Sequence, residues 1–191
     1  RHRHPGPMAL AKIRETELRA AASVLGVHEV ALLDYRDQHL DRENARQVVA
    51  AIVWHLRRVQ PDVVLTFGPD GGYGHPDHIA ISQLTTAAIV AASDPTFPSD
   101  GVQPEPPHAV SKLYYLAWPE SAWRAYQAAL RKLVVTVDGI ERRGMPGPDW
   151  AISTGIDTHK FWSTVWRAIS CHGSQIAAYE RLNELPPVHH E

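Results

Sequence analysis

Two histidines and an aspartate at residues 75–78 are the side chains of this sequence best suited to chemistry. His75 and His78 are three residues apart, and Asp77 lies between them. Imidazole nitrogen is a common zinc ligand, and histidine also exchanges protons near neutral pH. The two histidines can therefore share one metal ion, or divide metal binding and acid–base catalysis between them. Because a catalytic zinc needs three protein ligands, the pair alone cannot complete a site.

The segment that carries these residues has the pattern of a ligand site at the end of a strand. Residues 62–67 predict a strand that is apolar on both faces, and the glycine-rich turn 68–74 follows it directly. Pro76 suits the first position of a helix, whose free N–H groups favour an anion or an oxyanion. In α/β proteins, ligands bind at such carboxyl ends of strands. A structural role in helix capping is the alternative, whereas a phosphate loop is disfavoured because no Lys-Ser/Thr pair follows the glycines.

The elements around this segment alternate between helix and strand. We expect helices at 10–25, about 44–59, 76–92, 121–131 and 158–181, and strands at 28–35, 62–67, 112–118, 133–137 and 151–156, with long loops at 93–110 and 139–148. This order predicts a single α/β domain over 1–191 with a Rossmann-like, doubly wound, mostly parallel sheet flanked by helices. Such a sheet needs another strand or two before Leu10. We therefore expect its N-terminal βαβ portion to precede residue 1.

The composition disfavours several classes of protein. The 191 residues are 44% hydrophobic with a net charge of −2, which fits one folded domain and gives no basic surplus for binding nucleic acid. No apolar stretch approaches the ~18 residues that a membrane span needs. Cys171 is the only cysteine, so no internal disulfide can form and a reducing, cytoplasmic location is expected. Five tryptophans are expected in the core or in a pocket wall rather than on a stacking platform for bases: 118, 123, 150, 162 and 166.

Four segments, in order, resemble the LmbE-like family, also called the PIG-L deacetylases, over nearly the whole chain. They are Leu10–Gly26, Leu32–Leu40, Thr66–His78 and the stretch from Lys160 to Gln175. The third is the most specific, because Thr-Phe-Gly-Pro-Asp-Gly-Gly-Tyr-Gly-His-Pro-Asp-His matches a family motif almost residue for residue. The family consists of zinc-dependent enzymes that remove acyl groups from amino sugars and related amides.

The resemblance implies roles for the residues of this motif. His78 matches a zinc ligand, and His75 matches a catalytic histidine, taken as a cation that stabilises the oxyanion or protonates the leaving amine. Asp77 matches the carboxylate that orients His75. Tyr73 matches a mobile tyrosine near the reacting carbonyl.

Two further positions and one missing motif follow from the same resemblance. Arg14 and Asp37 match residues that contact polar groups of the substrate. By residue type alone, Arg14 can instead form a surface ion pair with Glu17, and Asp37 can instead belong to a turn. The family's first motif, Ala-His-Pro-Asp-Asp-Glu, supplies the general base and two more ligands of the one zinc ion. Residues 1–191 do not contain it. Since residue 1 is also not Met, we expect the motif upstream, and we expect this chain made alone to be inactive.

The resemblance thus implies part of a zinc-dependent N-deacetylase, an amidohydrolase that uses metal-activated water. The expected reaction removes an acyl group, above all N-acetyl, from a small amino sugar or related amide, with no nucleic acid or membrane partner. A non-catalytic carbohydrate- or nucleotide-binding module remains an alternative, as does a degenerate family member that acts only within an assembly. No motif specifies the substrate or the oligomeric state.

Overall fold

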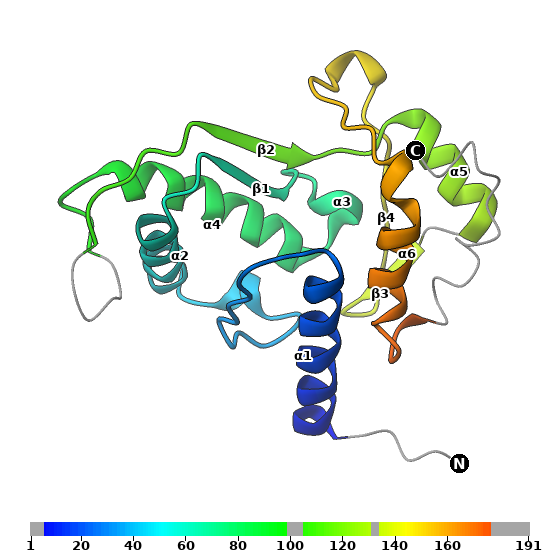
Figure 1. Ribbon diagram of the computed structural model, residues 1–191, viewed down its shortest axis with the longest axis horizontal. Helices are drawn as coiled ribbons and strands as arrows, with labels where there is room; N and C mark the ends of the chain where they lie inside the picture. Colours follow the sequence, from blue (N-terminus) through cyan, green and yellow to red (C-terminus); the bar gives the residue numbers. More distant parts are fainter. Residues whose placement is uncertain (1–5, 99–104, 131–133, 177–191) are drawn as a thin grey trace. The chain divides into compact units, whose positions relative to one another are not determined.

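A computed structural model of the chain describes residues 6–98, 105–130 and 134–176. These residues divide into two compact units. Figure 1 labels the helices and strands along the chain. The first unit contains the described residues up to 32, from 121 to 130 and from 153 on, and the second contains the rest. The fold is mixed α/β, as predicted. Of the predicted site residues, only Arg14 belongs to the first unit.

A parallel pair of strands forms the centre of the second unit. β1 (Val63–Phe67) pairs with β2 (Lys112–Leu116) from Val63↔Lys112 to Phe67↔Leu116, and α4 (Pro76–Ser93) connects them in sequence (Figure 1). Because the strands are parallel, both carboxyl ends lie at one edge, where the glycine-rich turn begins. Leu65 is 70% exposed, so the described residues cover β1 on one face rather than on both. The described part of the chain adds no third parallel strand, and the doubly wound sheet stays a prediction.

The core of this unit lies between α4 and α2 (Ala45–Val59). Asp41 and Asn44 were both candidates to cap α2, and Asn44 is the cap, because its side chain accepts the backbone N–H groups of residues 46 and 47. Val53 and Leu56 of α2 pack against Ala88 and Ala92 of α4, whose small side chains let the helices approach closely. Val59 is exposed because it lies in the last turn of α2, beyond the contact.

A buried arginine joins the same two helices. Arg57 is 4% exposed, although it lies in a predicted amphipathic helix next to the apolar stripe. Its guanidinium donates hydrogen bonds to four backbone carbonyls at and after the end of α4: those of Ala91, Ala92, Asp94 and Phe97. Ala91 and Ala92 lie in the last turn of α4, where a helix leaves carbonyls without intrahelical partners. Asp94 and Phe97 follow the helix. Arg57 therefore fixes how α4 ends.

A β-hairpin occupies part of the predicted loop 139–148. β3 (Val134–Val137) and β4 (Ile140–Arg143) pair in antiparallel fashion. Asp138 and Gly139 connect them with φ values of 52° and 75°. Two successive residues with positive φ are typical of the two-residue turns that match strand twist, and Asp-Gly is a preferred sequence for them. The prediction of a loop was therefore wrong for 140–143.

Two of the predicted strands are also wrong. Residues 28–35 form no strand, Leu32 and Leu33 are about two-fifths exposed, and Asp34 has a φ of 57° that interrupts an extended chain. Residues 151–156 begin in the short helix η2 (Asp149–Ala151) and continue as coil. A strand needs a neighbour for its backbone N–H and C=O groups, and no described segment pairs with either stretch.

The first unit is helical. α1 (Pro7–Val24) packs with α6 (Trp162–Ser170), which follows η3 (His159–Phe161), and α5 (Glu120–Leu130) contributes its described residues from 121 on. The predicted helix 158–181 is thus shorter, and its last residues lie outside the described ranges. Glu17 accepts both the N–H and the hydroxyl of Ser174, each at 2.7 Å, and these bonds lower the pKa of Glu17.

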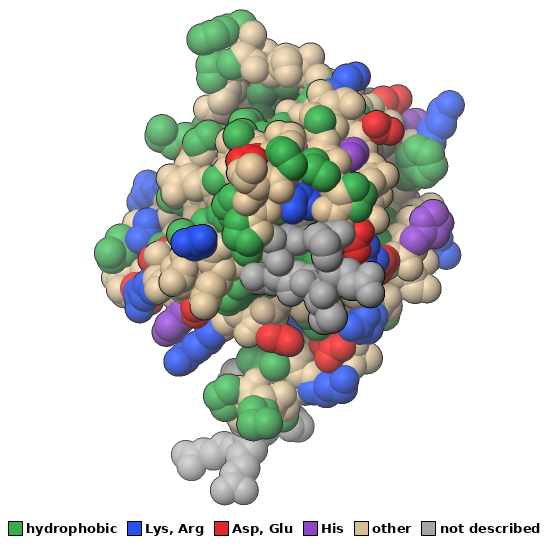
Figure 2. Space-filling view, turned by 90° about the vertical axis from the view of Figure 1, so that its left-hand side faces the viewer, with side chains coloured by type: hydrophobic (Ala, Val, Ile, Leu, Met, Phe, Trp, Pro, Cys, Tyr) green, Lys and Arg blue, Asp and Glu red, His purple; other side chains and the backbone are tan. Residues whose placement is uncertain are grey.

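The surface agrees with the balanced composition. Figure 2 shows a face on which positive and negative side chains are interspersed rather than gathered by sign. In the part of the chain that the structure describes, no helix is both long enough and apolar enough to cross a membrane.

Candidate active site

The turn after β1 depends on glycine. Gly71, Gly72 and Gly74 have φ values of 66°, 74° and 76° in the short turn α3 (Gly71–Gly74), a region that other residues rarely adopt. At Gly71 a Cβ atom would lie 2.8 Å from the side chain of Ile79 and 3.2 Å from that of His78. Glycine therefore allows the turn to lie directly against the first turn of α4.

His75 caps the start of α4, and Pro76 takes the first helical position as predicted. The Nδ1 atom of the buried His75 accepts the backbone N–H of Asp77 at 3.1 Å. A ring that accepts at Nδ1 carries its hydrogen at Nε2. The ring therefore presents its N–H donor at Nε2.

His78 lies one turn further along α4 with the opposite arrangement. Its Nδ1 donates to the carbonyl of Gly71 at 3.1 Å, which leaves the lone pair on Nε2. Phe67 stacks on the ring with centroids 3.8 Å apart. Burial lowers the pKa of His78, against the hydrogen bond to Gly71 and the charges of Asp77 and Asp37. A neutral imidazole fixed by a backbone carbonyl is the usual form of a histidine that binds metal.

The structure brings three of the predicted residues into one aromatic cluster. The rings of His75 and His78 stack with centroids 4.6 Å apart. Tyr73 contacts both edge-on, at 5.8 Å from His75 and 5.2 Å from His78. The cluster therefore places a nitrogen donor, a nitrogen lone pair and a phenol close together at the edge of the sheet.

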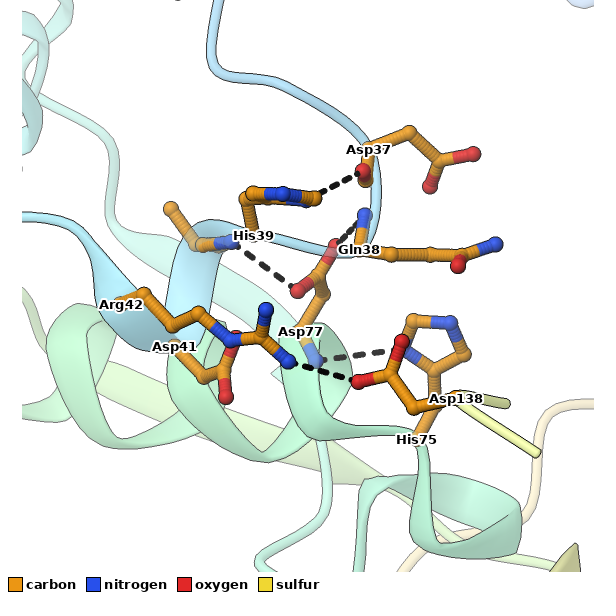
Figure 3. Close-up of polar contacts among 9 residues, drawn as sticks. Asp37, Gln38, His39, Asp41, Arg42, His75, Asp77 and Asp138 are labelled. Carbon is orange, nitrogen blue, oxygen red and sulfur yellow. Dashed lines mark hydrogen bonds and ion pairs between the residues drawn. The ribbon is translucent and has the colours of Figure 1, made fainter. Parts of the chain in front are cut away.

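Asp77 connects this cluster with the segment that carries Asp37. Its carboxylate accepts the backbone N–H groups of Gln38 at 2.6 Å and Leu40 at 3.0 Å (Figure 3). It contacts His75 through its own backbone N–H, whereas the resemblance implied its carboxylate. Asp77 thus orients His75 by fixing the start of the helix, and its carboxylate holds residues 38–40 and η1 (Leu40–Arg42) beside the site.

Asp77→Asn is expected to loosen this segment. Asparagine keeps one of the two acceptor oxygens and loses the charge, so the amides of Gln38 and Leu40 should exchange hydrogen about tenfold faster. Asp41→Asn is the matched control, because Asp41 lies in the same segment and is not bonded to these amides. Residue-resolved hydrogen exchange measures both variants. Unchanged exchange at 38 and 40 in Asp77→Asn would contradict this role.

The hairpin holds the same segments from a second direction. Arg142 of β4 donates to the carbonyl of Gly74 at 2.8 Å, directly before His75. Arg42 pairs with Asp138 in the hairpin turn at 2.7 Å (Figure 3). The sequence predicted neither of these two contacts, and it did not predict the hairpin. The Asp138-Gly139 pair is a local signal that could have revealed the hairpin.

The last two predicted site residues, Asp37 and Arg14, are exposed. Asp37 is exposed, and its carbonyl accepts Nδ1 of His39 at 3.2 Å. Arg14 lies exposed on α1 in the first unit, where its charge helps to lower the pKa of Glu17 after the larger effect of Ser174. His78 fits a single zinc ligand by its tautomer. The described residues contain no group of three His, Cys, Asp or Glu side chains that could hold a metal ion.

Comparison with known proteins gives one family. Residues 1–89 match the family model PIG-L, described as GlcNAc-PI de-N-acetylase. A 1D-myo-inositol 2-acetamido-2-deoxy-alpha-D-glucopyranoside deacetylase from Rhodococcus opacus (strain B4) is 40% identical over 68% of this chain and 43% of its own. One from Thermobifida fusca (strain YX), with the same name, is 30% identical over 88% of this chain and 63% of its own. The chain thus spans about half the length of these relatives.

A solved structure shares the fold. The crystal structure of the conserved protein TT1542 from Thermus thermophilus superposes with a TM-score of 0.57 at 22% identity. The match covers 89% of this chain and 63% of that protein. It supports the mixed α/β architecture described above.

Proposed function

The chain belongs to the PIG-L (LmbE-like) deacetylase family, and we propose that it forms one side of the active site of a zinc-dependent N-deacetylase acting on a small amino sugar or related amide. The observation that carries this proposal is the stacked pair of histidines. His78 presents a lone pair at Nε2, and His75 presents an N–H at Nε2, with the rings 4.6 Å apart. Hydrolysis of an amide needs both functions: a ligand for an electrophilic metal and a donor for the oxygen that gains charge.

The two histidines divide the work. Zinc, when bound, polarises the amide carbonyl and lowers the pKa of water. His78 would hold it through Nε2, and the carbonyl of Gly71 keeps the ring in the required tautomer. His75 donates a hydrogen bond from its Nε2–H to the substrate oxygen as negative charge develops there, and the leaving amine takes the proton that the general base has removed from water.

The surrounding residues position the histidines and the substrate. Tyr73 packs edge-on against both rings, limits their rotation and borders the reacting carbonyl. Asp37, exposed on the segment that Asp77 holds, accepts a hydrogen bond from a substrate hydroxyl. The general base and the other zinc ligands come from outside the described residues, as the family's Ala-His-Pro-Asp-Asp-Glu motif implies. The substrate contact of Arg14 stays a prediction from the resemblance.

Release of acetate by the full-length protein tests the proposal. The names of the Rhodococcus and Thermobifida relatives make 1D-myo-inositol 2-acetamido-2-deoxy-α-D-glucopyranoside the first substrate to assay. We expect a metal chelator to abolish release and added zinc to restore it, whereas a polypeptide of residues 1–191 should release none. Activity that survives complete removal of metal would overturn the proposed chemistry, and activity of the shorter polypeptide would overturn the need for outside residues.

A further inference from the structure

A cavity of about 450 Å³ lies at the carboxyl ends of β1 and β2, beside the histidine cluster. Three segments of the second unit form its walls: the glycine turn 68–74, the end of β2 with residues 115–118, and residues 143–147 after the hairpin. Ligand sites for small molecules occupy ~300–1,000 Å³ and lie preferentially at such strand ends. The roles assigned to His75 and His78 leave this space unused.

The walls combine flat apolar surface with a few hydrogen-bonding groups. Trp118 and Met145 supply apolar surface, and Asp70 and Arg143 supply a carboxylate and a guanidinium. The two charges are opposite, so the cavity has no strong preference for an anion or a cation. A hydroxylated ring fits this combination, because its C–H faces pack on an aromatic plane and its hydroxyls bond to a carboxylate.

The glycines of the turn shape this cavity. A Cβ atom at Gly68 would lie 2.6 Å from a carboxylate oxygen of Asp70, and one at Gly72 would lie 3.7 Å from the indole nitrogen of Trp118. A side chain at 68 would therefore displace the Asp70 carboxylate. On the other side, Gly147 donates its N–H to the carbonyl of Trp118 at 2.8 Å, which ties the third wall to the second. The cavity is thus built by the fold before any ligand arrives.

Tyr73 links the cavity to the reacting groups. It lines the cavity and also contacts the rings of both His75 and His78. The cavity and the histidine cluster therefore share Tyr73.

We propose that this cavity is the subsite for the hydroxylated ring that bears or adjoins the amide, and that Trp118 is a specificity-determining residue that selects ring-bearing over small acyclic amides. The proposal rests on the deacetylase function proposed above. Its recognition step, the binding of a sugar ring, can be measured without any turnover.

The test compares Trp118→Ala and Trp118→Phe with Trp150→Ala in the full-length protein. Trp150 is the matched control, because it lies in the same unit on η2 and is 88% exposed. With methyl 2-acetamido-2-deoxy-α-D-glucopyranoside as substrate, Trp118→Ala should lower kcat/KM roughly tenfold or more, and Trp118→Phe by less. With N-acetylethanolamine, which has no ring, kcat/KM should not change. Trp150→Ala should resemble the unaltered protein on both.

Saturation-transfer NMR with N-acetyl-D-glucosamine separates this proposal from the deacetylase function. If the protein hydrolyses neither substrate but binds the sugar in a manner lost in Trp118→Ala and kept in Trp150→Ala, the subsite stands and the reaction fails. An equal loss of kcat/KM on both substrates in the folded Trp118→Phe variant would overturn the proposed subsite. Sugar binding that Trp118→Ala leaves unchanged would overturn it as well.

Discussion

His75→Ala is expected to lower kcat for deacetylation by the full-length protein about 10²- to 10³-fold while its zinc content stays unchanged. The ring accepts the Asp77 N–H at Nδ1 and so directs its N–H, at Nε2, away from the helix. Alanine removes this donor to the substrate oxygen. The substitution leaves the Nε2 lone pair of His78 in place. Steady-state kinetics and metal analysis of the same preparation measure the two effects.

His78→Ala should give the opposite pattern of metal content. Removing its Nε2 deletes a zinc ligand, so zinc should be lost along with activity. His159→Ala is the control for general effects of losing an imidazole, because His159 is exposed in η3. The division of labour between the two histidines would be wrong if His78→Ala kept its zinc, or if His75→Ala lost zinc to the same extent.

The local part of this site was predictable from sequence because its geometry is set within a few residues. Consecutive glycines after an apolar run permit positive φ, and Pro76 favours a helix start. Together these place His75 at the N-cap and His78 one turn later. The capping hydrogen bond that fixes the tautomer of His75 follows from the same local geometry.

The connections between distant segments could not be read from residue type. The carboxylate of Asp77 bonds to the backbone N–H groups of Gln38 and Leu40, and backbone groups leave no mark in a sequence. Residues 28–35 have strand-like composition but form no strand, because strand formation depends on a pairing partner elsewhere. The hairpin 134–143 was different, since Asp138-Gly139 is a local signal that was missed.

Arg57 shows the same limit for the core, and it yields the largest expected effect on stability. The helix at about 44–59 was predicted, whereas one of its arginines was not expected to be 4% exposed. Arg57→Met keeps most of the aliphatic volume but leaves carbonyls at the end of α4 without their charged donor. We expect the free energy of unfolding to fall by about 3 kcal/mol, since hydrogen bonds to charged groups contribute ~1.5–3 kcal/mol each and some carbonyls keep other donors.

The adjacent arginine separates this effect from the loss of a positive charge. Arg58 is exposed, with its guanidinium 5.1 Å from the centre of the Trp54 ring, so Arg58→Met should cost less than about 1 kcal/mol. Urea unfolding followed by circular dichroism compares the two variants at unchanged slope. Equal destabilisation would mean that charge, rather than the four carbonyl contacts, is what matters at Arg57. Since Arg57 lies at the opposite end of α4 from His75, the folded Arg57→Met variant should keep its kcat, which distinguishes loss of stability from loss of the site.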